Sequence, residues 1–110
     1  ANEQEMEIEA AKLAQASSST ESIEELLAMI HPVPEEIEST KVTWNTTIGE
    51  AGLQSCSMEA TGLLDDSVKA VRIRLIARKK TEGWEILHVY KSQQCYNGRG
   101  HEYWSPEPCN

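Results

Sequence analysis

The spacing of apolar residues changes near Lys41, and this change divides the chain into a helical part and a sheet. Before Lys41, apolar residues recur every three or four positions over 3–16 and again over 20–30. After Lys41, apolar and polar residues alternate, which is typical of strands that bury one face. The pattern predicts an α+β domain in which one or two N-terminal helices pack on an antiparallel sheet.

The second helical segment has the stronger pattern. Ser18, followed three residues later by Glu21, predicts a capping box at its start. Pro32 and Pro34 end the helix, so we expect His31 to be a C-terminal cap instead of a ligand. Its apolar face is formed by Ile23, Leu26, Leu27 and Ile30.

The first helical segment, over 3–16, has a narrower apolar stripe and predicts a weak helix that frays or is absent. The net negative charge of the chain lies in its first 40 residues. Residues 1–40 carry ten acids and one base, whereas the rest of the chain has a net charge of +1. We therefore divide the chain into an acidic N-terminal segment over 1–19, flexible or weakly helical, and a single α+β domain over 20–110. The acidic segment serves as a solvated helix face or, alternatively, as an arm that docks on a basic patch.

Four segments of the second part alternate in the manner of strands. They cover 41–48, 53–63, 68–79 and 84–95, and short polar turns separate them. Short connections favour antiparallel neighbours, so we expect a four-stranded meander. In the last segment Trp84, Ile86, His88 and Tyr90 share one side, while Leu87 and Val89 share the other. Both sides are partly apolar, which indicates a sheet covered on both faces or curled around a cavity.

The three cysteines predict one staple and one buried thiol. Cys95 and Cys109 flank a segment with two Gly and two Pro that cannot form a long helix. A disulfide between them would close a loop of about 15 residues and contribute roughly 3 kcal/mol in the chain-entropy model. Cys56 is then left as a buried structural thiol, although its pairing with Cys95 or Cys109 stays open.

A disulfide indicates an oxidising compartment. The chain begins with Ala1 and not Met, so we expect a periplasmic or secreted protein whose signal peptide has been removed, although an engineered boundary would look the same. The chain has no run of 18 apolar residues, so the sequence predicts no membrane-spanning helix. The formal net charge of −8 argues against nucleic acid as a partner.

The segment between the two cysteines is the first candidate contact surface. Gly98 and Gly100 flank Arg99, whose guanidinium suits carboxylate or phosphate. His101 titrates near neutrality, and Tyr103 and Trp104 offer stacking surfaces. The alternative interpretation is a C-terminal clasp, with Trp104 plugging a core edge and Arg99 paired with a local acid such as Glu102.

A basic stripe along the third strand is the second candidate. It contains Arg72, Arg74, Arg78 and Lys80 on one face. Charges of one sign two residues apart repel, so the acidic helices or the neighbouring Glu59 and Glu85 should offset them. The functional interpretation is a site for an anion or an acidic partner.

The sequence gives little support for catalysis. A thiolate pair of Cys56 with His88 or His101 lacks any surrounding signature. A metal site from Cys95, His101 and Cys109, with His88, has a spacing that matches no standard zinc pattern, so we expect neither metal nor cofactor. The leading hypothesis is a small non-catalytic binding domain. It binds a protein or a small anionic ligand at the disulfide-closed segment between Cys95 and Cys109. The alternative is a small-ligand-binding or enzyme-like domain with a pocket between sheet and helix. The residues that would line it are Trp44, Met58, His88 and Trp84.

Overall fold

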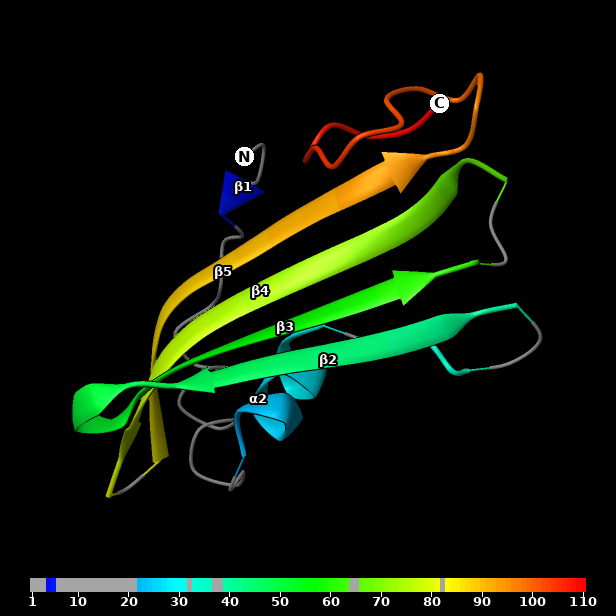
Figure 1. Ribbon diagram of the computed structural model, residues 1–110. Coiled ribbons are helices and arrows are strands. Elements are labelled where there is room, and N and C mark those ends of the chain that lie inside the picture. Colours follow the sequence, from blue (N-terminus) through cyan, green and yellow to red (C-terminus); the bar gives the residue numbers. More distant parts are fainter. Residues whose placement is uncertain (1–3, 6–21, 32, 37–38, 64–65, 82) are drawn as a thin grey trace.

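The computed structural model describes a helix and a five-stranded antiparallel sheet (Figure 1). The described residues are 4–5, 22–31, 33–36, 39–63, 66–81 and 83–110. The elements are β1 (Gln4–Glu5), α2 (Ile23–Ile30), β2 (Lys41–Ile48), the 3-10 turn η1 (Glu50–Gly52), β3 (Leu53–Thr61), β4 (Val68–Lys80) and β5 (Gly83–Cys95). The sheet order β1-β5-β4-β3-β2 confirms the four-stranded meander. Within these residues, no helix has the length and apolarity needed to cross a membrane.

The N-terminal segment differs from the expectation where it is described. Gln4–Glu5 forms strand β1, in register with Lys91 and Tyr90 of β5, and not the first turn of a helix. The rest of the predicted helix over 3–16 lies outside the described residues. Strand formation here depends on the neighbouring edge of β5, a tertiary contact that local composition does not reveal.

Helix α2 begins and ends at capping residues. The side chain of Ser22 accepts a hydrogen bond from the backbone N–H of Glu25, at 3.2 Å. Ser22 and Glu25 thus have the spacing of a capping box, whereas the box expected at Ser18 lies outside the described residues. At the other end, the backbone N–H of His31 donates to the carbonyl of Leu27, which confirms His31 as the C-terminal cap.

The core lies between α2 and one face of the sheet. In Figure 1, α2 lies next to β2 and β3. Each fully buried Leu, Ile or Met side chain stabilises the fold by about 1.5–3 kcal/mol, so this single layer supplies most of the hydrophobic stabilisation. The buried cluster comprises Ile23, Leu26, Leu27, Cys56, Met58, Ala60, Ile73, Leu75, Ala77, Trp84 and Val89.

A β-bulge in β5 changes which side chains face the core. Ile76 pairs with His88, but the next residue of β4, Ala77, pairs with Ile86. Leu87 is therefore an extra residue on β5, and the alternation of side chains is shifted by one position at this point.

The bulge explains why both sides of the last strand looked apolar. Before it, Trp84 and Ile86 face the core, and after it Val89 does so, opposite the buried Leu75. His88 and Tyr90 lie on the other face of the sheet. The expectation that Trp84, Ile86, His88 and Tyr90 share one side was therefore wrong, because strict alternation does not hold through a bulge.

Candidate binding surface

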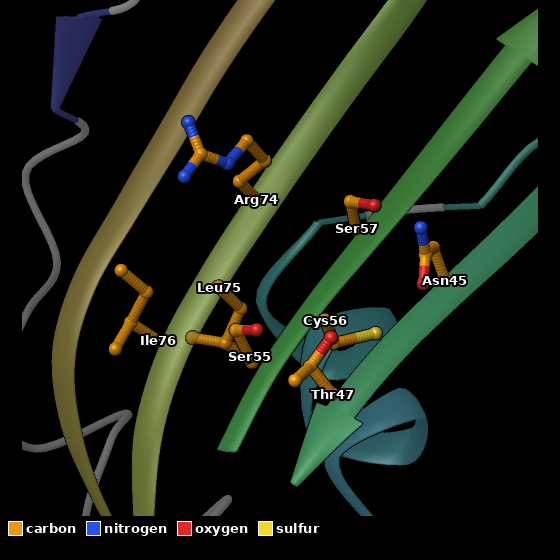
Figure 2. Close-up of a pocket in the computed structure, with 8 residues that line it drawn as sticks. All are labelled: Asn45, Thr47, Ser55, Cys56, Ser57, Arg74, Leu75 and Ile76. Atoms are coloured by element: carbon orange, nitrogen blue, oxygen red, sulfur yellow. The ribbon is translucent and has the colours of Figure 1, made fainter. Parts of the chain in front are cut away.

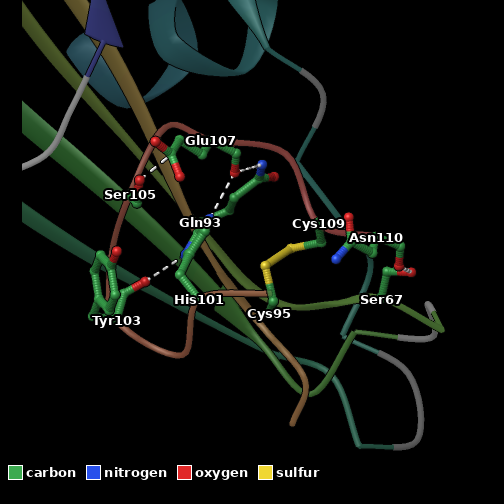
Figure 3. Close-up of a disulfide and its surroundings, with 9 residues drawn as sticks. All are labelled: Ser67, Gln93, Cys95, His101, Tyr103, Ser105, Glu107, Cys109 and Asn110. Atoms are coloured by element: carbon green, nitrogen blue, oxygen red, sulfur yellow. Dashed lines mark hydrogen bonds between the residues drawn. A yellow bond between two sulfur atoms is a disulfide. The ribbon is translucent and has the colours of Figure 1, made fainter. Parts of the chain in front are cut away.

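The segment after β5 is tied to the sheet by a disulfide. Cys95 and Cys109 are bonded, with an S–S distance of 2.09 Å and Cα atoms 5.5 Å apart (Figure 3). Cys56 is a free, buried thiol. Both findings confirm the predicted use of the three cysteines.

Hydrogen bonds reinforce this staple and shape residues 95–110, which we call the stapled loop. Gln93 and Ser105 exchange two backbone hydrogen bonds, of 2.8 and 3.0 Å. The side-chain amide of Gln93 also donates to the carbonyl of Glu107 at 2.6 Å. At the C-terminus, the N–H of Asn110 donates to the carbonyl of Arg99, and the hydroxyl of Ser67 donates to the carbonyl of Asn110. The loop is therefore an ordered addition to the sheet edge.

His101 lies within the stapled loop and bonds to it through both ring nitrogens. Nε2 is 2.7 Å from the carbonyl oxygen of Glu107, and Nδ1 is 2.8 Å from that of Tyr103. Carbonyl oxygens only accept hydrogen bonds, so both contacts are satisfied only when the ring is the doubly protonated cation. The bond to Glu107, followed by that to Tyr103, raises the pKa of His101 above its ordinary value of 6.5. His101 thus acts inside the loop and does not present its ring nitrogens to a partner.

The other predicted contact residues of the loop divide into two groups. Arg99 is exposed at the tip, and Tyr103 is 60% exposed. Among the described residues, no ion pair joins Arg99 to Glu102, the acid expected to hold it. Trp104 instead lies on the sheet, with the guanidinium carbon of Arg72 4.6 Å from its ring centre. The loop is thus a clasp at Trp104 and an open surface at Arg99 and Tyr103.

The basic stripe occupies the face of the sheet opposite the core. Arg72 pairs with Glu59 of β3 at 3.6 Å. Arg78 and Lys80 share Glu85 of β5, at 3.2 and 3.5 Å. These contacts confirm the predicted cross-strand pairing. The alternative, in which acidic helices cover the stripe, was wrong for α2, which packs on the other face through its apolar residues.

Arg74 lies at the centre of this open face beside aromatic rings. Its guanidinium carbon is 5.6 Å from the ring centre of Tyr90, and Tyr90 stacks on His88 with ring centres 5.6 Å apart. Arg72 and Trp104 form the next such contact along the strand. The three predicted arginines therefore share one face, and Trp104 connects that face to the stapled loop.

A shallow polar groove runs along β3 on the same face, and the sequence did not predict it. Ser55 and Ser57 have small side chains, and the residues of β2 and β4 beside them are larger, so a hollow forms above the serines (Figure 2). A second hollow continues it toward Glu59. The residues that line the two hollows are Thr43, Trp44, Asn45, Thr47, Ser55, Cys56, Ser57, Glu59, Arg74, Leu75 and Ile76.

The signal for this groove was present in the alternation of β3. Even positions from Cys56 to Ala60 are buried, while the odd positions hold two serines. Small hydroxyl residues at successive positions of one face leave room above the sheet, whereas larger side chains would fill it.

The candidate nucleophile and metal ligands are not arranged for chemistry. Burial raises the pKa of the Cys56 thiol, a hydrogen bond with Thr46 lowers it by less, and Glu24 adds to the rise. The thiol is therefore protonated near neutral pH, and it lies on the core face while His88 lies on the open face. Cys95, His101 and Cys109 bring possible ligand atoms within 4.8 Å of one another, but the two sulfurs are bonded to each other and offer no thiolate.

Of the four residues expected to line a pocket between sheet and helix, Trp44, Met58 and Trp84 lie on the core face, where Trp44 is the register partner of Met58, and His88 does not. Met58 and Trp84 are part of the buried core, and Trp44 is 40% exposed on the edge strand. His88 is on the opposite face of the sheet, because of the bulge at Leu87. Comparisons of the chain with protein-family models, with curated proteins and with solved structures find no match.

Proposed function

We propose that this protein is a non-catalytic binding domain, exported to an oxidising compartment, that binds a small polar anion. The contact surface would extend from the groove over β3 across Arg74 to the exposed part of the stapled loop. The observation that carries this proposal is the position of Arg74, which lines the groove next to Ser57, its register partner on β3, with Asn45 beyond Ser57 on β2 (Figure 2).

The charge of the open face supports an anionic ligand. Among the described strands of this face, the stripe carries four bases, whereas the acids beside them are Glu59 and Glu85, so bases outnumber acids there in a chain of net charge −8. A guanidinium binds carboxylates with planar, charge-assisted hydrogen bonds. The serine, threonine and asparagine side chains beside it can donate and accept hydrogen bonds to the rest of a polar ligand.

The stapled loop supports the proposal in two ways. Trp104 covers Arg72 and so makes one wall of the open face. The disulfide fixes the loop, which keeps the cost of ordering it on binding low. Disulfides persist in oxidising compartments, which supports export to the periplasm or the cell exterior.

The test is titration with a carboxylate-bearing sugar, glucuronate, and with neutral glucose, monitored by NMR. We expect the wild-type protein to bind glucuronate more tightly than glucose. Arg74→Gln should weaken glucuronate binding about ten- to hundredfold, the effect of losing a charge-assisted hydrogen bond of about 1.5–3 kcal/mol. The matched control is Lys79→Gln, which removes the same charge from the same strand but on the opposite face, where Lys79 lies 4.9 Å from the Trp84 ring. Equal loss in both variants, or no binding by the wild type, would contradict the proposal.

A further inference from the structure

The two edges of the sheet differ in whether their outward backbone groups are hydrogen-bonded. Along β5, the backbone N–H and C=O groups that point outward, away from β4, belong to alternate residues. Gln93 exchanges hydrogen bonds with Ser105, the N–H of Cys95 donates to the carbonyl of His101, and Lys91 is in register with β1. This edge is therefore paired over three successive outward positions.

The edge formed by β2 has no such cover among the described residues. The backbone N–H of Val42 donates to the Glu36 carboxylate at 2.9 Å, which shows that even-numbered residues of β2 direct their backbone groups outward. The next three outward residues are Trp44, Thr46 and Ile48, and within the part of the chain that the structure describes their outward backbone groups accept and donate no hydrogen bond. The free edge thus begins at Trp44, directly after the Glu36 cap.

The composition of this edge makes its exposure unusual. Proteins protect exposed edge strands with charges, proline or bulges. Residues 42–48 contain none of these, and Trp44 and Ile48 are 40% and 73% exposed. Both lie on the same face of the strand, because they are four positions apart.

We propose that β2 pairs with β2 of a second copy of this chain, antiparallel and across a two-fold axis beside Thr46. In this register the three free outward residues pair among themselves: Thr46 with the partner's Thr46, and Trp44 with the partner's Ile48. Val42 keeps its Glu36 cap. The two sheets become one continuous sheet of ten strands, and the exposed aromatic and β-branched side chains pack as a cross-strand pair.

Charge complementarity selects a second copy in this orientation. The only charge on β2 is Lys41 at its start, and Glu50 follows its end. Antiparallel pairing brings Lys41 of each chain to the end where the partner's Glu50 lies, so opposite charges meet at both ends of the interface. A parallel arrangement would place like charges together. The two Glu24 carboxylates, each accepting a hydrogen bond from its own Thr46, lie on the core side near the axis and oppose association.

Sedimentation of the full chain, from about 10 μM to about 1 mM, tests this self-association, since weak dimers become populated over that range. We expect the average mass to rise toward twice that of one chain. Ile48→Lys should keep the protein monomeric, because it places a charge beside the partner's Trp44. Tyr103→Lys, which adds the same charge at another exposed hydrophobic residue, should leave association unchanged.

Amide hydrogen exchange distinguishes this interface from any other. The N–H groups of Trp44, Thr46 and Ile48 should become protected as concentration rises, while those of the odd residues of β2, already bonded to β3, should not change. A chain that stays monomeric throughout, or that associates with unchanged exchange at these three amides, overturns the proposal.

Discussion

The guanidinium of Arg72 lies against the face of the Trp104 ring, with its carbon atom 4.6 Å from the ring centre. Arg72 belongs to the middle of the sheet, and Trp104 belongs to the last seven residues of the chain. The contact therefore fastens the stapled loop onto the open face. Ser92, the cross-strand neighbour of Arg72 on that face, is fully buried.

Removal of the Trp104 ring should destabilise the fold. A cation–π contact and the apolar area beneath it together contribute about 1–2 kcal/mol. We expect Trp104→Ala to lower the free energy of unfolding by that amount in urea titrations. Tyr103→Ala, at a more exposed ring of the same loop, serves as control and should have a smaller effect. Equal losses would show that Trp104 has no special contact with the sheet.

The disulfide should supply a large share of the stability of this small domain. Opening Cys95–Cys109 releases a loop of about 15 residues, which costs roughly 3 kcal/mol in the chain-entropy model. We expect the double variant Cys95→Ser, Cys109→Ser to lose about that amount in thermal and urea unfolding. Cys56→Ser serves as the control, because it replaces a cysteine that lies outside the stapled loop. Unchanged stability of the double variant would mean that the hydrogen bonds alone hold the loop.

His101 should make the stability of the loop depend on pH. Folding raises the pKa of its imidazole above 6.5, because both ring nitrogens donate to carbonyl oxygens. A raised pKa means that the folded state binds the proton more tightly than the unfolded state does. The stabilising contribution is therefore fully present below about pH 6.5 and is lost as the pH rises through the raised pKa of the folded state.

Urea unfolding between about pH 5 and pH 9 measures this contribution as the difference between wild type and His101→Gln. The difference in unfolding free energy should be largest at the acidic end and shrink with increasing pH. A difference that is constant or grows with pH would contradict the assignment of His101 as a cation. His88, exposed on the open face, offers the control variant His88→Gln.

The two glycines beside Arg99 should respond differently to substitution. A Cβ on Gly100 would lie 3.0 Å from Cys95 Sγ, and its φ of +139° is a region that other residues avoid. Gly98 has a φ of +85° but no atom within 4 Å of an added Cβ. We expect Gly98→Ala to lower the free energy of unfolding by about 1–2 kcal/mol, because of the backbone conformation alone. Gly100→Ala should cost more and slow disulfide formation on refolding; similar behaviour of the two variants would refute the close packing at Gly100.

Much of the sheet could be predicted from the sequence, because its cause is local. The alternation of β2, β3 and β4 and the short turns between them set the strands and their antiparallel order. Glu59 and Glu85 could be named as partners of the stripe, since their strands were expected to flank it. The disulfide followed from the two cysteines around a segment without helical or strand pattern.

Other features depend on tertiary contacts or on single residues. The bulge at Leu87 shifts the alternation of β5, and no composition signal marks it. Strand β1 forms because β5 has a free edge beside it. The roles within the stapled loop were also hidden: the sequence placed Arg99, His101 and Trp104 in one surface, whereas His101 bonds inward and Trp104 lies on Arg72.

We propose that the open face of the sheet binds a small polar anion. Mapping backbone amide shifts of the full chain during glucuronate titration tests it most directly. We expect saturable shifts over 43–47, 55–59 and 72–74, with little change at Leu26 and Leu27 in α2. Saturable shifts that avoid these three strand segments, or no saturable shifts at all, would contradict it.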